Sequence, residues 1–401
     1  MYEMLIFGTG KGAADFFKMR NKQEIKVKAF IDNNCDKWGK LFEKTEIIPP
    51  NRINEYTYDY IVIASSYFNE ITRQLEDLGV NSDKIRCTCM EMEYIDFIRD
   101  EYIRLYSYQY SKKIVKEMIL KQLKMEMLWS LPREKAVKKL YREYSGKTLK
   151  LEKPETFDEK IQYLQLYRYG QMEANCTDKI KARDFIIGMG MEEHLPKLYA
   201  TYNKAEEVNF NFLPEQFVLK VNNGAGYNII CKDKKKISYA VCRKELKRWL
   251  EEEYGKRGLE FHYARIEPRI LCEEYIDYGQ GNDIIDFKFH CFSGKVHTIL
   301  TCTERSIGLK LNYYDTSWNP IHYEIEKLRG KVMEKPDRLN EMIAIAEKLA
   351  KPFPFVRVDL YYTNGKIYVG ELTFTPMCGR IYYLTEEAQK IMGSLVNVDY
   401  C

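Results

Sequence analysis

The sequence predicts an α/β region at the N-terminus, a helical linker, and an α+β region over the rest of the chain. Strand and helix patterns alternate over residues 1–90, which is typical of a parallel sheet with helices on both faces. Residues 91–147 contain a single glycine, Gly146, and have helical periodicity. Over residues 148–401, alternating strands flank glycine turns, as in antiparallel sheets. We therefore expect three parts, with boundaries near residues 90 and 147.

The composition is that of an ordinary soluble globular protein, with 45% hydrophobic and 30% charged residues among 401. A formal net charge of +4 gives no global attraction to nucleic acid, so we expect no nucleic-acid partner. Eleven cysteines, none spaced as C-x-x-C, indicate reduced thiols rather than a disulfide framework or structural zinc. We expect no signal peptide, because the N-terminus leads directly into a predicted strand, and no apolar run approaches the ~18 residues that a transmembrane helix needs. We expect a cytoplasmic protein.

A glycine turn follows the first predicted strand of the N-terminal region. Three strands are expected there, at residues 4–7, 27–31 and 60–64. Gly8 and Gly10 lie in the turn, before an amphipathic stretch, and Asp32 follows the second strand. In a Rossmann-like sheet, such a turn directs a helix N-terminus at a phosphate, and the acid binds ribose hydroxyls. We expect these three residues to bind a nucleotide or nucleotide sugar. The alternative is a structural domain whose glycines only let strand and helix pack closely.

The linker is the most basic part of the chain. Residues 111–150 hold twelve basic and four acidic side chains. Val115, Ile119 and Leu123 recur at helical spacing among lysines, and Pro132 predicts the start of a second helix. We expect these helices to pack between the folded regions. A weak contact with an anionic membrane surface is the alternative.

The third region opens with a helix whose start is well marked. Thr156 and Glu159 have the spacing of a capping box, which predicts a helix from residue 157. Further strands are expected at residues 216–221, 227–231, 269–276, 287–292 and 295–301, and helices at residues 239–255 and 339–351.

A hairpin over residues 355–374 carries the polar groups that say most about function. Arg357 and Asp359 lie on its first strand, and Glu371 and Thr373 lie on its second. Two carboxylates on neighbouring strands can hold Mg²⁺, because this hard ion takes few protein ligands and completes its shell from water and substrate phosphates. The alternative is a charged, solvated sheet face.

The length of the turn decides whether these groups meet, since strand side chains alternate between faces. A two-residue turn would pair Asp359 with Gly370 and would place the two carboxylates on opposite faces. A three-residue loop ending at Gly365 would pair Asp359 with Val369 and bring all four polar side chains to one face. We expect the longer loop.

Lys220 lies on a predicted strand, directly before the glycine-containing loop 222–226. Backbone N–H groups of such a loop can close over a triphosphate while the ammonium neutralises its charge. The spacing does not match G-x-x-x-x-G-K-[ST], so this is not a P-loop. A solvated lysine is the alternative.

The order of these parts resembles the ATP-grasp superfamily, in which two α+β lobes close on ATP. Six segments also look like the TupA-like ATP-grasp family, named for teichuronopeptide synthesis: residues 153–161, 178–179, 217–226, 287–294, 313–318 and 353–374. This resemblance covers about residues 147–395 and implies an ATP-grasp fold for the C-terminal region. Residues 30–33, 37–39 and 63–67 resemble small nucleotide-binding-type domains at the start of some bacterial sugar-modifying enzymes.

The resemblance implies an ATP-dependent ligase that uses Mg²⁺ and joins a carboxylate to an amine. The implied ATP-binding residues are Lys179 or Lys181, Lys220, Asn223, Gly224, Ala225, Gly226, Glu273, Glu274, Tyr275 and Ile276. The implied metal ligands are Asp359, Glu371 and Thr373, and the implied catalytic residues are Arg357, Lys288 and Arg305. Thr373 departs from the Glu-x-Asn pattern of many ATP-grasp enzymes, so a second Mg²⁺ would be held more loosely.

The implied substrates are a hexuronic acid, free or carried on a nucleotide, and an amine that the sequence does not name. The implied setting is bacterial capsule or surface polysaccharide synthesis. Three alternatives stay open: a kinase of this fold acting on a sugar hydroxyl, a glycosyltransferase, and a non-catalytic scaffold that senses nucleotide through residues 1–90.

Overall fold

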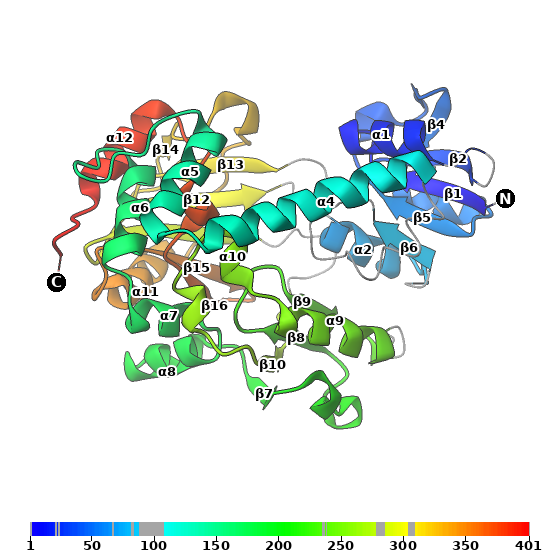
Figure 1. Cartoon of the computed structure of the whole chain (residues 1–401). Coiled ribbons are helices and arrows are strands. Elements are labelled where there is room, and N and C mark those ends of the chain that lie inside the picture. The colour runs from blue at the N-terminus through cyan, green and yellow to red at the C-terminus, as the bar shows by residue number, and fades with distance from the viewer. Residues whose placement is uncertain are drawn as a thin grey trace. The chain divides into compact units, whose positions relative to one another are not determined.

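The computed structural model describes residues 2–20, 22, 25–65, 68–81, 84–87, 108–234, 237, 239–277, 285–303 and 309–400. The described residues up to Lys124 belong to one compact unit (Figure 1). Those from Met125 onward, apart from Leu309, belong to a second unit.

The first unit is built on a six-stranded sheet in the order β3-β4-β2-β1-β5-β6. Its strands are β1 (Tyr2–Phe7), β2 (Ile25–Ile31), β3 (Leu41–Phe42), β4 (Thr45–Ile48), β5 (Tyr60–Ile63) and β6 (Ile85–Cys87). All neighbouring strands pair in parallel except β3 with β4. The short helices η1 (Cys35–Lys37) and η2 (Pro50–Glu55) lie in its connections.

Within the described residues, one helix packs on each face of this sheet, because successive strand residues point to opposite faces. Met4 and Ile6 pack with Phe16 of α1 (Lys11–Met19). Leu5 and Phe7 pack with Ile71 and Leu75 of α2 (Phe68–Asp77). The predicted Rossmann-like, doubly wound sheet is confirmed.

Two helices follow, α4 (Tyr108–Trp129) and α5 (Arg133–Ser145). Pro132 is the N-cap of α5, so the second helix starts where the sequence predicts. Met125 and Leu128, near the end of α4, pack with Val137 of α5 in a cluster of the second unit. None of the described helices is long and apolar enough to cross a membrane. The linker boundaries at residues 91 and 147 stay predictions.

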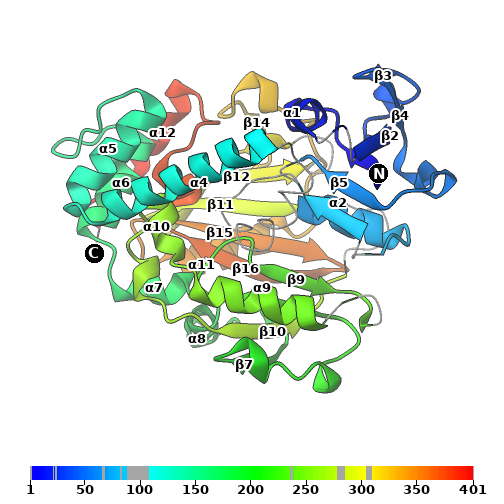
Figure 2. The ribbon, with the colours of Figure 1, turned by 45° about the vertical axis from the view of Figure 1, so that its right-hand side comes forward.

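The second unit contains two antiparallel sheets, which Figure 2 shows in green and in yellow to orange. The smaller has the order β7-β10-β8-β9, with β7 (Leu198–Tyr202), β8 (Phe217–Val221), β9 (Asn228–Cys231) and β10 (Ile270–Glu274). The larger has the order β14-β13-β12-β11-β15-β16, with β11 (Asp286–Phe292), β12 (Lys295–Thr303), β13 (Lys310–Tyr314), β14 (Pro320–Ile321), β15 (Phe355–Thr363) and β16 (Lys366–Thr373).

The second unit also contains further helices. They are α6 (Phe157–Tyr167), α7 (Gln171–Thr177), α8 (Lys181–Gly188), α9 (Tyr239–Glu251), α10 (Tyr254–Gly258), α11 (Leu339–Ala350) and α12 (Glu386–Leu395), with short helices η5 (Glu192–His194), η6 (Ala205–Glu207), η7 (Phe210–Phe212), η9 (Tyr263–Arg265), η10 (Glu326–Leu328) and η11 (Pro376–Gly379). Leu246 of α9 packs on Leu219 and Cys272 of the smaller sheet. Helix α11 lies against β11, β12 and β15 of the larger sheet. Alternation of the strand side chains then turns Lys220 away from α9, and Lys288 and Asp359 away from α11.

The predicted capping box starts α6. Thr156 Oγ1 accepts a hydrogen bond from Glu159 N, and Glu159 Oε2 accepts one from Thr156 N. Together these bonds satisfy backbone donors that would otherwise lack a partner at the helix start.

The hairpin β15–β16 has a two-residue turn, so the predicted three-residue loop and the pairing of Asp359 with Val369 are wrong. Asn364 and Gly365 have φ of 51° and 73°, the conformation of a type I′ turn. Leu360 pairs with Val369, but Asp359 pairs with Glu371, so Gly370 is an extra residue in the ladder. This β-bulge shifts the register by one residue and brings the carboxylates to one face.

Candidate functional site

Asp359 lies at the centre of a buried polar cluster on β11 and β15. Arg357 donates from Nε to Asp359 Oδ1 at 2.6 Å and from Nη2 to Asp359 Oδ2 at 2.7 Å. Lys288, directly opposite on β11, donates from Nζ to Asp359 Oδ2 at 2.5 Å. Both carboxylate oxygens therefore accept charge-assisted hydrogen bonds, which are stronger than neutral ones.

Glu371 and Thr373 complete the polar face from β16. Arg357 Nη2 donates to Glu371 Oε1 at 3.2 Å and to Thr373 Oγ1 at 3.1 Å. Thr373 Oγ1 donates to Glu371 Oε1 at 3.0 Å. The side chain of Glu371 is 38% exposed and that of Asp359 is 2% exposed, so Glu371 is the more accessible carboxylate. The four side chains expected to share a face do so.

Charges within this cluster set the protonation of its members. Burial alone would raise the pKa of Asp359, but Arg357 and Lys288 lower it to about 2. Burial lowers the pKa of Lys288, yet the carboxylates of Asp286 and Asp359 outweigh that effect and raise it overall. At neutral pH, Asp359 is a carboxylate and Lys288 is an ammonium.

On the smaller sheet, Lys220 and Arg183 share one buried carboxylate. Lys220 Nζ lies 2.6 Å from Glu273 Oε2, and Arg183 Nη1 lies 2.9 Å from Glu273 Oε1. Lys220 and Glu273 come from the neighbouring strands β8 and β10, and Arg183 comes from α8. Sequence analysis missed Arg183, because a charged residue early in a helix carries no local sign of its distant partner.

The loop 222–226 is fixed at its start by Asn222. Asn222 Nδ2 donates to Asp178 Oδ1 at 2.8 Å, and Asn222 Oδ1 accepts from Arg269 N at 2.7 Å. Asp178 directly precedes Lys179, whose ammonium donates to the carbonyl oxygens of Gly224 and, at 3.4 Å, of Val221. The ammonium of Lys179 is thus held against the glycine loop.

Lys179, and not Lys181, reaches this loop. Lys181 is the first residue of α8 and its side chain is exposed. Burial lowers the pKa of Lys179 to about 8, the carboxylate of Glu371 opposes that change, and Lys220 adds to it. Lys179 therefore lies within electrostatic range of Lys220 on one sheet and of Glu371 on the other.

The glycines of the loop have two different requirements. Gly226 has a φ of 80°, in the left-handed region that favours glycine. At Gly224 the requirement is space, because a Cβ atom would lie 2.3 Å from the ring of Tyr227 and 2.9 Å from that of Tyr254. Ala225 lies between them without a positive φ, so the alanine fits the loop. Asn223 is buried, and its Oδ1 has no hydrogen-bond partner in the part of the chain that the structure describes.

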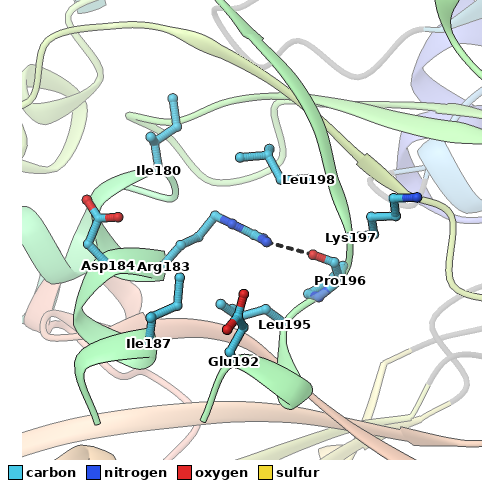
Figure 3. Close-up of a pocket in the computed structure, with 9 residues that line it drawn as sticks. All are labelled: Ile180, Arg183, Asp184, Ile187, Glu192, Leu195, Pro196, Lys197 and Leu198. Carbon is cyan, nitrogen blue, oxygen red and sulfur yellow. Dashed lines mark hydrogen bonds between the residues drawn. The ribbon is translucent and has the colours of Figure 1, made fainter. Parts of the chain in front are cut away.

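A cavity of about 420 Å³ lies beside the pair of Arg183 and Glu273 (Figure 3). Its walls come from α8, η5 and the segment before β7: Ile180, Arg183, Asp184, Ile187, Glu192, Leu195, Pro196, Lys197 and Leu198. Figure 3 shows Arg183 crossing this space to donate to the carbonyl oxygen of Pro196 at 2.8 Å.

The segment from Glu273 to Ile276, which the family resemblance implies to bind ATP, adjoins this cavity. Glu274 N donates to Lys197 O at 2.9 Å, and Lys197 N donates to Glu274 Oε2 at 3.2 Å. Tyr275 and Ile276 follow β10 and are half-buried. Arg305, which the family resemblance implies to be a catalytic residue, lies outside the described residues.

The turn after β16 is held by a buried carboxylate that sequence analysis also missed. Thr375 Oγ1 donates to Glu260 Oε1, and Cys378 Sγ donates to Glu260 Oε2 at 3.4 Å. Met377 and Cys378 have φ of 51° and 56°, a conformation that costs about 1–3 kcal/mol for residues other than glycine. Glu260 lies more than 100 residues before this turn, so no local pattern in the sequence connects them.

The residues present fit a magnesium ion that arrives with phosphates. Among the described residues, no group of three or more His, Cys, Asp and Glu side chains is placed to hold a metal. Mg²⁺ bound with a nucleotide needs only one or two protein carboxylates. Asp359 and Glu371 are directly opposite each other and supply that donor set.

In the first unit, Asp32 already has partners. Lys37 Nζ lies 2.9 Å from Asp32 Oδ2, which also accepts from Thr9 Oγ1, and Asn34 N donates to Asp32 Oδ1 at 2.9 Å. These bonds brace the ends of β1 and β2 against each other.

The two predicted glycines of this unit differ in role. Gly8 has a φ of 109°, and a Cβ atom there would lie 3.2 Å from the carbonyl oxygen of Ala64. Gly10 is the N-cap of α1, with open space where a Cβ atom would be. Gly8 is thus needed for packing, whereas Gly10 leaves room beside a helix N-terminus. Nucleotide binding by Gly8, Gly10 and Asp32 stays a prediction.

Comparisons with known proteins give two family matches at separate parts of the chain. Residues 159–397 match the family described as TupA-like ATPgrasp. Residues 1–86 match the domain described as C2185-like, N-terminal. No curated protein matches the chain.

Three solved structures illustrate its distant likenesses. D-alanine–D-alanine ligase from Bacillus anthracis is 14% identical, over 99% of this chain and 96% of that chain, with a TM-score of 0.33. L-amino acid ligase from Bacillus licheniformis is 14% identical, over 99% and 74%, with a TM-score of 0.33. N5-carboxyaminoimidazole ribonucleotide synthetase, in an ADP complex, is 14% identical, over 93% and 70%, with a TM-score of 0.34. These scores are too low to carry an argument. The match to the TupA-like family spans more than half of the chain, so the protein belongs to the TupA-like ATP-grasp family and is an ATP-grasp ligase.

Proposed function

We propose that the protein uses ATP to activate the carboxylate of a hexuronic acid and joins it to an amine. The observation that carries this proposal is the shared face of Arg357, Asp359, Glu371 and Thr373, bonded to one another. Lys179, which lies between α7 and α8 and donates to the glycine loop beside the smaller sheet, is within electrostatic range of Glu371. Cations and carboxylates placed in this way suit phosphoryl transfer, which depends on positioning and charge stabilisation.

The proposed reaction has two steps. A carboxylate oxygen of the acceptor attacks the γ-phosphorus of ATP, and the bond from that phosphorus to the bridging oxygen breaks, releasing ADP. The amine nitrogen then attacks the carbonyl carbon of the acyl phosphate. The carbon–oxygen bond to phosphate breaks, phosphate leaves, and the nitrogen loses a proton as the amide forms.

Each cation near the site has a place in this scheme. Lys179 and Lys220 hold the α and β phosphates, and the loop 222–226 closes over them. Glu273 keeps its ion pair with Arg183 when Lys220 turns to the phosphates, so the negative charge of the buried carboxylate stays paired with a positive charge. The segment Glu273 to Ile276 contacts adenine through backbone groups.

On the larger sheet, Arg357 neutralises the transferred phosphoryl group and then the acyl phosphate. Asp359 and Glu371, with a weaker contribution from Thr373, would hold Mg²⁺, and the ion would offset the charge of the phosphates. Lys288 contributes a further positive charge on the same face, 2.5 Å from Asp359.

The acceptor is proposed to be a hexuronic acid carried on a nucleotide that the first unit binds. Support comes from the Rossmann-like sheet, from the open space at Gly10, and from Asp32 at the end of β2. The proposed setting is synthesis of a bacterial capsule or another surface polysaccharide.

Product analysis separates this function from its alternatives. The protein is incubated with Mg-ATP, a uronic acid nucleotide and a mixture of amines, and products are followed by mass spectrometry. ADP with a new amide supports the ligase. ADP with a phosphorylated sugar indicates a kinase, a new glycosidic bond indicates a glycosyltransferase, and absence of any ATP turnover supports a scaffold.

A weak contact with an anionic membrane surface through residues 111–150 is a second proposal. Ile119, Leu120 and Leu123 of α4 expose more than half of their surface, which favours insertion between lipid head groups. Sedimentation with phosphatidylserine vesicles tests it, and equal binding by an Ile119→Glu, Leu123→Glu variant would contradict it.

A further inference from the structure

Lys288 occupies the position where a metal charge is expected beside Asp359. Its Nζ atom lies 2.5 Å from Asp359 Oδ2 and 3.5 Å from Asp286 Oδ2. The other contacts of Asp359 come from Arg357, which reaches both carboxylate oxygens. A carboxylate with three charged hydrogen bonds has little lone-pair capacity left for a metal ion.

We propose that Lys288 keeps free metal out of the site and that Mg²⁺ binds only together with the triphosphate. On this view, the ammonium of Lys288 leaves Asp359 for a phosphate oxygen as the metal–nucleotide complex enters. One oxygen of Asp359 then becomes available to the metal. This inference rests on the proposed function, because it requires a nucleotide bound over the same sheet face.

The charges of the cluster give the physical reason. Asp286, Asp359 and Glu371 carry three negative charges, and Lys288 and Arg357 carry two positive ones. Adding a divalent cation alone would leave this largely buried cluster with excess positive charge, which is costly in a low-dielectric environment. The phosphates of a nucleotide remove that excess, so metal and nucleotide stabilise each other's binding.

A structural role for Lys288 leads to a different expectation. In a purely structural role, the ammonium would stay with Asp359 and Asp286 in the loaded enzyme and would make no contact with phosphate. Removal of Lys288 would then leave the affinity for a metal–nucleotide complex unchanged or increased. The inference requires that the same removal increases affinity for free metal and decreases affinity for the complex.

The test measures metal binding directly and does not depend on turnover. Mn²⁺ replaces Mg²⁺, and the electron paramagnetic resonance signal of unbound Mn²⁺ is followed with and without ADP, for the full chain and for Lys288→Met. We expect the variant to bind Mn²⁺ about tenfold more tightly than the unmodified protein when ADP is absent, and Mn·ADP about tenfold more weakly. Lys288→Arg keeps the positive charge and is expected to keep weak binding of free Mn²⁺.

A matched control comes from the same sheet. Lys295→Met removes a lysine of β12 that pairs with Glu347 at 2.8 Å and is 78% exposed, and both affinities should stay unchanged. If Lys288→Met does not fold by circular dichroism, Lys288→Gln serves in its place, because the amide can still donate to Asp359.

The outcomes distinguish this inference from the proposed function. An unmodified protein that binds neither Mn·ADP nor Mn·ATP would overturn both. Binding of Mn·ADP by the unmodified protein, with equal affinity of Lys288→Met for free Mn²⁺, would overturn the role of Lys288 alone. Tight binding of free Mn²⁺ by the unmodified protein would also overturn the role of Lys288 in excluding free metal.

Discussion

Asp359 and Glu371 face each other across the β15–β16 ladder only because Gly370 is inserted between Glu371 and Val369 as a bulge. A regular ladder from the two-residue turn would pair Asp359 with Gly370 and turn Glu371 to the other face. The bulge is therefore the feature that brings two carboxylates and Arg357 together. Bulges of this kind are frequent beside active sites, where they redirect a side chain.

The first prediction concerns this bulge. A Cβ atom at position 370 would lie 2.6 Å from the ring of Tyr361, so Gly370→Ala must displace the ring or the strand. We expect a loss of about 1–3 kcal/mol in the free energy of unfolding, which is typical of overpacking, and weaker binding of Mn·ADP. Denaturant unfolding and metal binding measure the two effects. Gly188→Ala, at the end of α8 and with open space around its Cβ position, is the control, and it should neither lower the free energy of unfolding nor weaken metal binding. A Gly370→Ala variant with unchanged metal binding would contradict the importance of the bulge.

The second prediction concerns Lys220. The substitution Lys220→Ala removes a charge-assisted phosphate contact worth roughly 1.5–3 kcal/mol. We therefore expect ATP to bind about ten- to a hundredfold more weakly. Glu273 keeps Arg183 as a partner at 2.9 Å, so the variant should fold. Calorimetric titration of ATP measures the change, with Lys295→Ala as the control. Equal ATP affinity in the folded Lys220→Ala variant would refute the role of Lys220.

The third prediction concerns the pH dependence of nucleotide binding. Burial lowers the pKa of Lys179 to about 8, so its ammonium loses a proton as pH rises through that value. A bound triphosphate favours the charged form. ATP binding should therefore take up a proton near pH 8, and ATP affinity should fall from about pH 7 to about pH 9.

Calorimetry in buffers of different ionisation enthalpy detects this proton uptake. Lys179→Arg keeps its charge throughout the range, so its ATP affinity should change less with pH. Identical pH profiles for the two proteins would remove Lys179 from the phosphate site. In the absence of nucleotide, the free energy of unfolding changes with pH in the opposite direction to ATP affinity. The unfolded chain binds more protons between pH 8 and 10.5, so this lysine makes the free protein more stable as pH rises through that window.

The sequence was sufficient where the signal is local. The capping box of Thr156 and Glu159 and the alternating strands of the first unit follow from short patterns, and the structure confirms them. The register of β15–β16 could not be derived in the same way, because counting residues across a turn assumes a regular ladder. Nothing in the sequence marks Gly370 as an extra residue. The need for glycine there is visible only in the structure, where the ring of Tyr361 occupies the space of a Cβ atom at position 370.

Contacts between distant segments were also beyond the sequence. The choice between Lys179 and Lys181 depends on Asp178, whose Oδ1 accepts hydrogen bonds from Ile180 N, directly before α8, and from Asn222 Nδ2. The ion pair of Arg183 with Glu273 joins residues separated by 90 positions. Such contacts arise when elements pack, and pattern analysis of one sequence carries no information about them.

The last prediction concerns the first unit. If this unit binds the uronic acid nucleotide and the second binds ATP, Asp32→Ala should leave ATP affinity intact and increase the concentration of uronic acid nucleotide required for turnover. A carboxylate at the end of β2 can accept hydrogen bonds from ribose hydroxyls, and its present partner Lys37 is 41% exposed, so solvent can take over that ion pair at little cost. Steady-state kinetics with each substrate varied in turn measures both effects. Glu55→Ala, which removes an exposed ion pair with Arg52 in the same unit, is the control and should change neither requirement. Unaltered dependence on both substrates in Asp32→Ala would favour a purely structural role for this unit, and a loss of ATP affinity would mean that the first unit, rather than the second, binds ATP.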